Sequence, residues 1–196
     1  MADAGRVIAG SARGTRLDAP GAGTRPLADR VKQVLFGVLD PDLAGAAVLD
    51  LFAGSGAGGI EALSRGAARA MFVEKDAGAA RVIGENLRRT KLEASARVVR
   101  RDAITWLADP SGAAAEAPFD LVLVDPPYVE TDLLGRALEL VGPFVRPGGR
   151  VVAKHFWRDA PPAEVGLLAS EREKRLGETA LTFYRRQEQG EEAGKA

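Results

Sequence analysis

The chain has 196 residues, 46% of them hydrophobic, which is enough apolar material for one ordinary domain without stabilising cross-links. It has no cysteine and one histidine, His155, which excludes disulfides and a cysteine nucleophile and argues against a metal site. The formal net charge is zero, so overall charge says nothing about nucleic acid. The sequence shows neither a membrane-spanning apolar run nor a signal-peptide pattern, and we expect a cytoplasmic monomer.

Residues 1–22 are expected to form a small β-hairpin that precedes the main domain. Residues 6–10 and 15–17 have the character of strands, and residues 11–14 supply the turn. Basic residues outnumber acidic ones in this part of the chain, which fits either a solvated surface or a contact with nucleic acid. An amphipathic helix is then predicted to begin at Asp29 or at the preceding Thr24-Arg25-Pro26.

From residue 46 onward, the apolar pattern alternates between strands and helices. Strands are predicted over 47–53, 70–74, 96–101, 119–125, 150–154, 167–176 and 179–186. Helices are predicted over 59–65, 77–91 and 133–145, with Asp76 as an N-cap. This alternation gives an α/β fold with a doubly wound, mostly parallel seven-stranded sheet, and the last two strands form an antiparallel hairpin. We assign residues 23–187 to this domain and expect residues 188–196 to be a disordered tail.

A glycine-rich turn, residues 50–59, joins the first strand of the sheet to its first helix. Glycines here let a ligand approach the backbone. Their spacing also fits a dinucleotide fold, so a nicotinamide oxidoreductase remains a possible alternative. Asp50 favours S-adenosylmethionine instead, because a carboxylate suits a cationic or hydrogen-donating ligand better than a pyrophosphate. A helix-capping role is the alternative for Asp50.

Two further acids end successive strands of the predicted sheet. Glu74 stands where an acid accepts hydrogen bonds from ribose hydroxyls, and Asp102 stands where an acceptor meets the adenine amino group. Each is also suited to capping a helix. Because these strand ends share one edge of the sheet, they outline a crevice for an adenosine. The candidate cofactor contacts are Asp50, Phe52, Ala53, Gly54, Ser55, Gly56, Glu74, Lys75, Asp102 and Ala103.

The most specific motif is Asp125-Pro126-Pro127-Tyr128, which ends the fourth strand. An ionised Asp only accepts hydrogen bonds, the prolines fix the backbone and remove amide donors, and the tyrosine ring can stack on a base. This combination suits an NH₂ group on a flat ring, whose lone pair becomes more nucleophilic when acceptors hold both N–H bonds. We therefore predict that Asp125, Pro126, Pro127 and Tyr128 are the catalytic residues of an amino-methyltransferase. The alternative is a strand-ending turn with a core tyrosine.

These motifs resemble those of class I methyltransferases and, more narrowly, those of the RsmD family of bacterial 16S ribosomal RNA guanine-N2 methyltransferases. The resemblance runs from about Arg6 to Arg186. Its residues are Arg6-Val7-Ile8-Ala9-Gly10, Arg13-Gly14, Thr24-Arg25-Pro26, Asp29-Arg30-Val31-Lys32, Leu35-Phe36, Asp50-Leu51-Phe52-Ala53-Gly54-Ser55-Gly56, Glu61-Ala62-Leu63-Ser64-Arg65-Gly66 and Asp125-Pro126-Pro127-Tyr128. It implies a Rossmann-like fold, S-adenosyl-L-methionine as cofactor, no metal, and methylation of the exocyclic N2 of guanine 966 in an assembling 30S subunit.

The resemblance also gives the basic N-terminal segment a role. An enzyme that acts on folded RNA must extrude its base and hold the backbone. The candidate RNA contacts are Arg6, Arg13, Arg16, Arg25 and Arg30. Since this segment precedes the sheet, we expect that deleting the hairpin spares the fold and the cofactor crevice.

Two departures from the family pattern affect the expected substrate edge. Leu27-Ala28 replaces a usual pair of threonines, and Lys154-His155-Phe156 stands where an acidic or small residue is expected. Two alternatives for the function remain. One is an amino-methyltransferase that acts on adenine N6 in DNA or RNA, and the other is a non-catalytic RNA-binding assembly factor.

Overall fold

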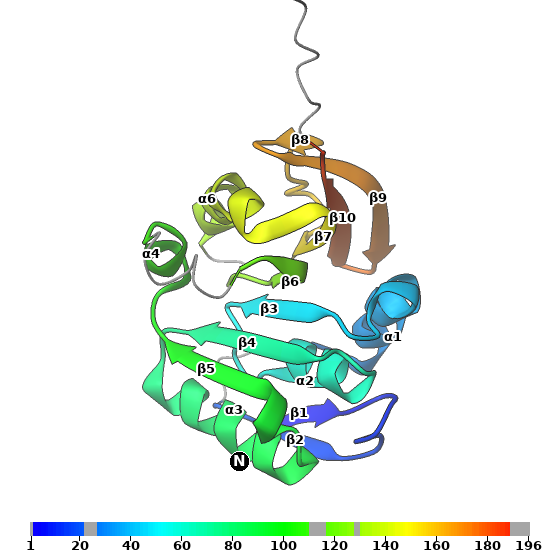
Figure 1. Ribbon diagram of the computed structural model, residues 1–196, viewed down its shortest axis with the longest axis vertical. Helices are drawn as coiled ribbons and strands as arrows, with labels where there is room; N and C mark the ends of the chain where they lie inside the picture. Colours follow the sequence, from blue (N-terminus) through cyan, green and yellow to red (C-terminus); the bar gives the residue numbers. More distant parts are fainter. Residues whose placement is uncertain (1, 22–26, 110–116, 128–129, 189–196) are drawn as a thin grey trace, which may run out of the picture.

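The computed structural model describes residues 2–21, 27–109, 117–127 and 130–188, which contain one eight-stranded sheet (Figure 1). In spatial order its strands are β5 (Ala96–Arg100), β4 (Arg69–Glu74), β3 (Ala47–Leu51), β6 (Phe119–Val124), β7 (Val145–Phe156), β10 (Thr179–Arg186), β9 (Leu168–Leu176) and β8 (Glu164–Val165). The first five are parallel, and the last three pair antiparallel. The predicted doubly wound sheet with a C-terminal hairpin is confirmed, and the two-residue β8 adds an eighth strand at the edge.

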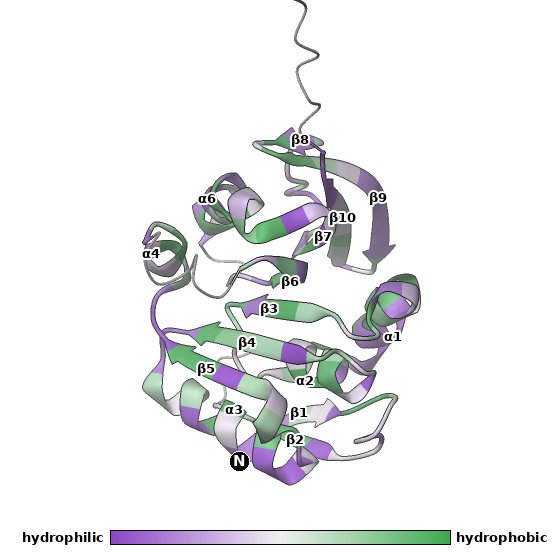
Figure 2. Ribbon diagram, viewed as in Figure 1, coloured by the Kyte–Doolittle hydropathy of each residue, from purple (hydrophilic) through white to green (hydrophobic). Residues whose placement is uncertain are grey.

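Helices cover both faces of the sheet and define two apolar layers. One face is covered by α1 (Asp29–Leu39), α2 (Ala57–Ser64) and α3 (Ala77–Thr90), and the other by α4 (Ala103–Leu107) and α6 (Thr131–Val141). Short 3₁₀ turns follow at η1 (Asp40–Asp42), η2 (Glu93–Ser95) and η3 (Gly142–Phe144). All of β3 is buried, as a strand with helices on both faces requires. Figure 2 shows the contrast with β9, an outer strand that is largely hydrophilic.

Several predicted boundaries were wrong for identifiable reasons. The helix expected over 133–145 is divided between α6 and η3, because Pro143 cannot donate the hydrogen bond that would continue an α-helix. β7 already begins at Val145, and a bulge between Val145 and Arg150 accommodates Pro147 within the strand. Helix α4 was not predicted, because five residues are too few to show a helical period. The predicted cap is confirmed, since Asp76 accepts a hydrogen bond from the amide of Ala79.

The N-terminal hairpin consists of β1 (Ala2–Arg6) and β2 (Arg16–Ala19), which form a separate two-stranded sheet. The predicted hairpin is present, with strands that lie further from the turn than expected. Its apolar side chains belong to the same core as the helices α1, α2 and α3. Those side chains are Ala4, Val7, Ala12, Leu17 and Ala19. The hairpin is therefore packed into the protein and does not hang free of the sheet.

Buried polar groups of the helices fix the hairpin in place. Glu61 of α2 is fully buried and accepts hydrogen bonds from the amides of Ile8 (2.7 Å) and Ala9 (3.0 Å). Lys32 of α1 is also fully buried and donates to the carbonyl of Arg6. Removing the hairpin would break these hydrogen bonds and expose to water the apolar surface on which the hairpin packs, which costs stability. We therefore expect truncation to destabilise the fold, in contrast to the expectation from sequence.

Two glycines of the hairpin provide a matched test of this docking. Both have positive φ, +85° at Gly10 and +84° at Gly14, so alanine at either position costs about 1–2 kcal/mol of backbone strain. A Cβ at Gly10 would lie 1.7 Å from the carbonyl oxygen of Ser64, whereas one at Gly14 meets nothing within 4 Å. We predict that Gly10→Ala lowers the unfolding free energy by about 1–3 kcal/mol more than Gly14→Ala does. Urea denaturation measures both, and equal losses would contradict the docking.

Candidate active site

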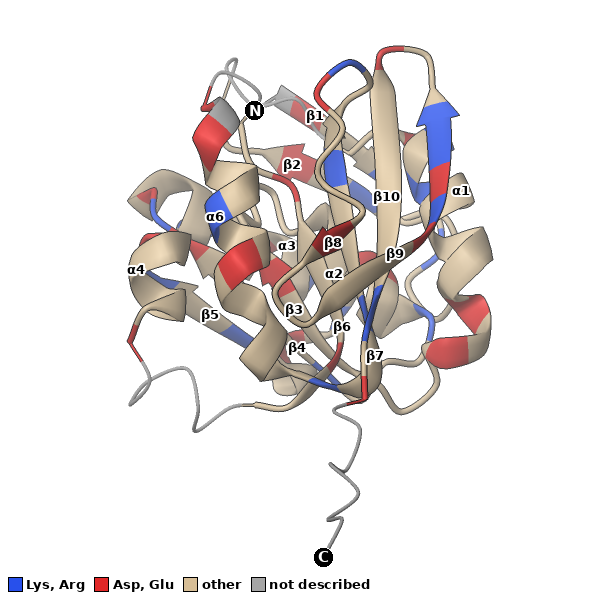
Figure 3. Ribbon diagram, turned by 90° about the horizontal axis from the view of Figure 1, so that it is seen from above, with Lys and Arg blue, Asp and Glu red and all other residues tan. Residues whose placement is uncertain are grey.

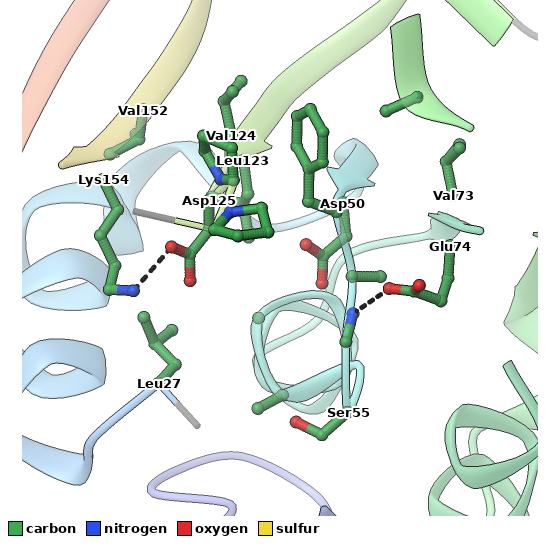
Figure 4. Close-up of a pocket in the computed structure, with 18 of the residues that line it drawn as sticks. Leu27, Asp50, Ser55, Val73, Glu74, Leu123, Val124, Asp125, Val152 and Lys154 are labelled. Atoms are coloured by element: carbon green, nitrogen blue, oxygen red, sulfur yellow. Dashed lines mark hydrogen bonds and ion pairs between the residues drawn. The ribbon is translucent and has the colours of Figure 1, made fainter. Parts of the chain in front are cut away.

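A cavity of about 500 Å³ opens at the carboxyl edge of the parallel strands (Figure 4). Its wall includes every predicted cofactor residue except Gly56, together with three residues of the Asp-Pro-Pro-Tyr motif. These residues are Asp50, Phe52, Ala53, Gly54, Ser55, Glu74, Lys75, Asp102, Ala103, Asp125, Pro126 and Pro127. Tyr128 and Arg25 lie outside the described residues. The two motifs, which are separated in sequence, therefore meet in one space of the size that small ligands occupy.

The glycines of the loop after β3 have different roles. Gly54 has φ +57°, and a Cβ there would meet only a carbonyl oxygen at 3.9 Å, so the space above it is open. Gly56 has φ +76° and is the N-cap of α2, where it turns the chain into the helix. At Gly59, a Cβ would lie 2.4 Å from the ring of Phe72, which means that this glycine allows α2 to pack on the sheet. The loop thus combines ligand access with helix packing.

Asp50 is the penultimate residue of β3, and its carboxyl group is buried with one oxygen bound to the protein backbone. Its Oδ2 accepts a hydrogen bond from the amide of Gly59 at 2.8 Å, so the capping role considered for Asp50 is present. The carboxylate also lies at the cavity, opposite Asp125 (Figure 4). Burial raises the pKa of Asp50 to about 8, and the carboxylates of Asp125 and Glu74 add to the rise. In the absence of a cation, Asp50 therefore carries a proton at neutral pH.

Glu74, at the end of β4, and Asp102, which follows β5, each accept hydrogen bonds from nearby backbone amides. Glu74 accepts hydrogen bonds from the amides of Gly54 and Asp76, both at 2.8 Å, which fixes the glycine loop against the end of β4. Asp102 caps α4 by accepting from the amide of Thr105 at 2.9 Å, and this hydrogen bond lowers the pKa of Asp102. Both acids line the cavity while they serve these structural roles. A carboxylate has lone pairs for further donors, so structural and ligand roles are compatible.

Asp125 follows directly after β6 and forms an ion pair that the sequence pattern did not reveal. Its Oδ1 lies 2.6 Å from Nζ of Lys154 on the neighbouring strand β7. The Lys154 side chain is only 12% exposed and lines the same cavity. Burial raises the pKa of Asp125, and the Lys154 ammonium opposes that rise. Sequence reasoning noted Lys154 as a departure from the family pattern and did not place it in the site.

The described candidate RNA-binding arginines lie away from the cavity wall. Arg6 pairs with Asp29 at 3.3 Å, and Arg16 pairs with Asp3 at 3.1 Å. Arg13 and Arg30 have exposed side chains. Figure 3 shows Lys and Arg interspersed with Asp and Glu over the molecule, so positive charge is not confined to the hairpin.

The fold and this cavity define a class I methyltransferase. The family model described as "Conserved hypothetical protein 95" matches residues 5–185. Ribosomal RNA small subunit methyltransferase D of Escherichia coli is 35% identical over 95% of this chain and 92% of its own length. YlbH of Bacillus subtilis is 38% identical over 92% of this chain and 98% of its own length.

A solved structure agrees with the sequence relatives. The Escherichia coli protein yhhF has a TM-score of 0.82 and 33% identity, with 94% of this chain and 98% of that chain covered. The chain belongs to the RsmD family of methyltransferases. The family assignment argues against the nicotinamide oxidoreductase that the glycine spacing left open. Within the described residues, no helix is long and apolar enough to cross a membrane.

The raised pKa of Asp50 predicts how stability depends on pH. An unfolded Asp titrates near 3.9, so between about pH 4 and pH 8 the folded protein holds a proton that the unfolded chain lacks, and stability falls as pH rises. Asp50→Asn keeps an acceptor for the Gly59 amide and removes the titration. We predict that, without ligand, Asp50→Asn is more stable than the wild type by at least about 1 kcal/mol at pH 8.

Urea denaturation at several pH values measures this difference. The advantage of Asp50→Asn should shrink as the pH falls toward 4 and level off below it, because residue 50 is then uncharged in the folded and unfolded states of both proteins. Parallel stability curves for the two proteins between pH 4 and pH 8 would contradict the assignment of the proton to Asp50.

Proposed function

We propose that the protein transfers a methyl group from S-adenosyl-L-methionine to the exocyclic N2 of a guanine in 16S ribosomal RNA, at nucleotide 966 of an assembling 30S subunit. The observation that carries this proposal is the meeting of Asp50 and Asp125 at one cavity (Figure 4). The first suits a cationic cofactor and the second suits an amino group. The name of the Escherichia coli relative supports ribosomal RNA of the small subunit as substrate.

The residues at the cavity fit this cofactor. Asp50 accepts from the cofactor's ammonium group, Gly54 leaves room for close approach, and Glu74 accepts from the ribose hydroxyls. Asp102 and Ala103 also line the cavity, and we propose that they contact the adenine of the cofactor. When bound, the cofactor supplies an electrophilic methyl group. The three acids Asp50, Glu74 and Asp125 make the cavity suited to a ligand with positive charge.

Asp125 and the prolines hold the target amino group. The carboxylate of Asp125 accepts an N–H bond of that group, which frees the nitrogen lone pair for attack along the line to the methyl carbon. Pro126 is buried and Pro127 is exposed, and neither donates a backbone hydrogen bond. Tyr128 is proposed to stack on the extruded base. The nitrogen loses its proton during or after transfer, to Asp125 or to water.

The arginines of the N-terminal segment are proposed to hold the RNA backbone. Arg13 and Arg30 are exposed, so their guanidinium groups are accessible to phosphates. Arg6 and Arg16 are paired with exposed or half-exposed acids, and such surface ion pairs are weak enough to exchange for phosphate. Phosphate contacts of this kind position an RNA without reading its sequence.

The direct test is Asp125→Asn. The amide keeps the shape of the carboxylate but lacks its charge, so we predict that methyl transfer falls by about 10²–10⁴-fold, while affinity for S-adenosylhomocysteine changes less than about threefold. Transfer is measured as methyl incorporation into 30S particles from a strain that lacks this activity, and affinity is measured by calorimetry. Near-normal turnover in Asp125→Asn would remove Asp125 from the reaction.

Mass spectrometry of the product nucleosides distinguishes the possible substrates. N2-methylguanosine supports the proposal, whereas N6-methyladenosine supports the adenine alternative. A wild-type protein that binds RNA and methylates neither base would support the non-catalytic assembly factor.

A further inference from the structure

Lys154 is a largely buried cation at the wall of the active-site cavity. It lies near the end of β7, and the register pairs Ala153 of β7 with Val124 of β6, which directly precedes Asp125. Parallel pairing therefore brings the ends of the two strands together and places Lys154 beside the carboxylate. The lysine and the aspartate are 29 positions apart in sequence, so their contact depends on the sheet and not on a local motif.

The ion pair uses one of the two carboxylate oxygens. Nζ of Lys154 lies 2.6 Å from Oδ1 of Asp125, a short distance for a charge-assisted hydrogen bond. In Figure 4, the other oxygen of Asp125 lies in the space between the side chains of Lys154 and Asp50, which both line the cavity. A carboxylate held at one oxygen cannot rotate freely about its Cβ–Cγ bond. The second oxygen is therefore fixed in the space where a ligand would approach.

We propose that Lys154 is a positioning residue, which holds Oδ1 of Asp125 so that the second oxygen faces the target amino group as an ionised acceptor. This inference rests on the proposed function. Lys154 acts only through the carboxylate of Asp125 and takes part in no bond-making step.

Charge supports the same role. Asp125 lies across the cavity from Asp50, and burial disfavours the ionisation of Asp125 by raising its pKa. The walls of a second, smaller hollow include the titratable residues Glu130, His155 and Asp159. Lys154 lines both the cavity and this hollow. Its ammonium is the cation that opposes the effect of burial on the pKa of Asp125.

Stability alone is a weaker explanation for this pair. The pair is partly buried, with side chains 12% exposed at Lys154 and 28% exposed at Asp125, so both partners lose hydration, and apolar residues at such a pair often stabilise a fold as well or better. A lysine beside a cavity that also contains three acids instead sets the protonation state of the carboxylate that it contacts. A positioning role can be separated from a structural one by its pH dependence.

The kinetic experiment compares Lys154→Met with Lys154→Arg. Methionine keeps an unbranched chain without charge, and arginine keeps the charge. With methionine, we expect at least a tenfold loss of kcat at pH 7 and a shift of the acid limb of the kcat–pH profile upward by at least one pH unit, so that activity recovers at higher pH. With arginine, the acid limb should stay near its wild-type position.

Lys174→Met is the matched control. Lys154 and Lys174 both pair with Leu181 of β10, so they share a face of the sheet, but Lys174 is exposed on β9. Its replacement should leave the acid limb unchanged. An unshifted acid limb in Lys154→Met, or a loss of activity that is equal at every pH, would overturn the proposal.

A second measurement needs no RNA and no turnover. Carbon-13 NMR of labelled aspartate carboxyls, with the Asp125 signal assigned from Asp125→Asn, gives the titration midpoint of this carboxyl directly. The midpoint should be higher in Lys154→Met than in the wild type, and equal midpoints would overturn the proposal. If the midpoint shifts but the wild-type protein methylates no RNA, the positioning contact stands and the proposed function fails.

Discussion

The burial of carboxylates at the carboxyl edge of the parallel sheet is the constraint on which the active site depends. Asp50 and Asp125 lie near the carboxyl ends of the adjacent strands β3 and β6. One oxygen of Asp50 accepts from the amide of Gly59, and one oxygen of Asp125 accepts from Lys154. This arrangement leaves acceptor capacity directed at the cavity from two sides. Without a cationic ligand, the protein bears the cost of keeping acids out of water, and a bound cation would relieve part of that cost.

The N-terminal hairpin packs in the same hydrophobic core as the helices beside the cavity. Ala19 of the hairpin and Leu35 of α1 both lie at the cavity wall, and both belong to the core beneath α2. Glu61 and Lys32, which are fully buried, connect the hairpin to the helices that flank the glycine loop. A segment that we propose to contact RNA is therefore coupled by packing to the site where the methyl group is transferred.

The sequence was sufficient for features that depend on local pattern. Continuous apolar runs gave the central strands, Asp76 gave a helix start, and the motif around Asp125 gave the class of chemistry. Features that depend on contacts between neighbouring strands could not be predicted from local sequence patterns. Lys154 contacts Asp125 through the register of β6 and β7, and no local signal states which side chain a lysine on a neighbouring strand will face.

The contrast between local pattern and tertiary contact also explains why the sequence did not predict the roles of Lys32 and Gly56. Lys32 follows an acidic helix start and has the sequence context of a surface lysine, yet it is fully buried because the hairpin covers it. Gly56 fits the spacing of a ligand-binding loop, but its left-handed conformation begins α2 and it does not line the cavity. Glycine spacing alone cannot separate conformational need from ligand contact.

Proton release on cofactor binding tests the central claim most directly. If Asp50 is protonated in the free protein and ionised beside the ammonium group of the cofactor, then binding of S-adenosylhomocysteine at pH 7 must release close to one proton. Isothermal calorimetry in buffers of different ionisation enthalpy counts that proton, and Asp50→Asn is the control that should release none. Binding by the wild-type protein without proton release would contradict the account.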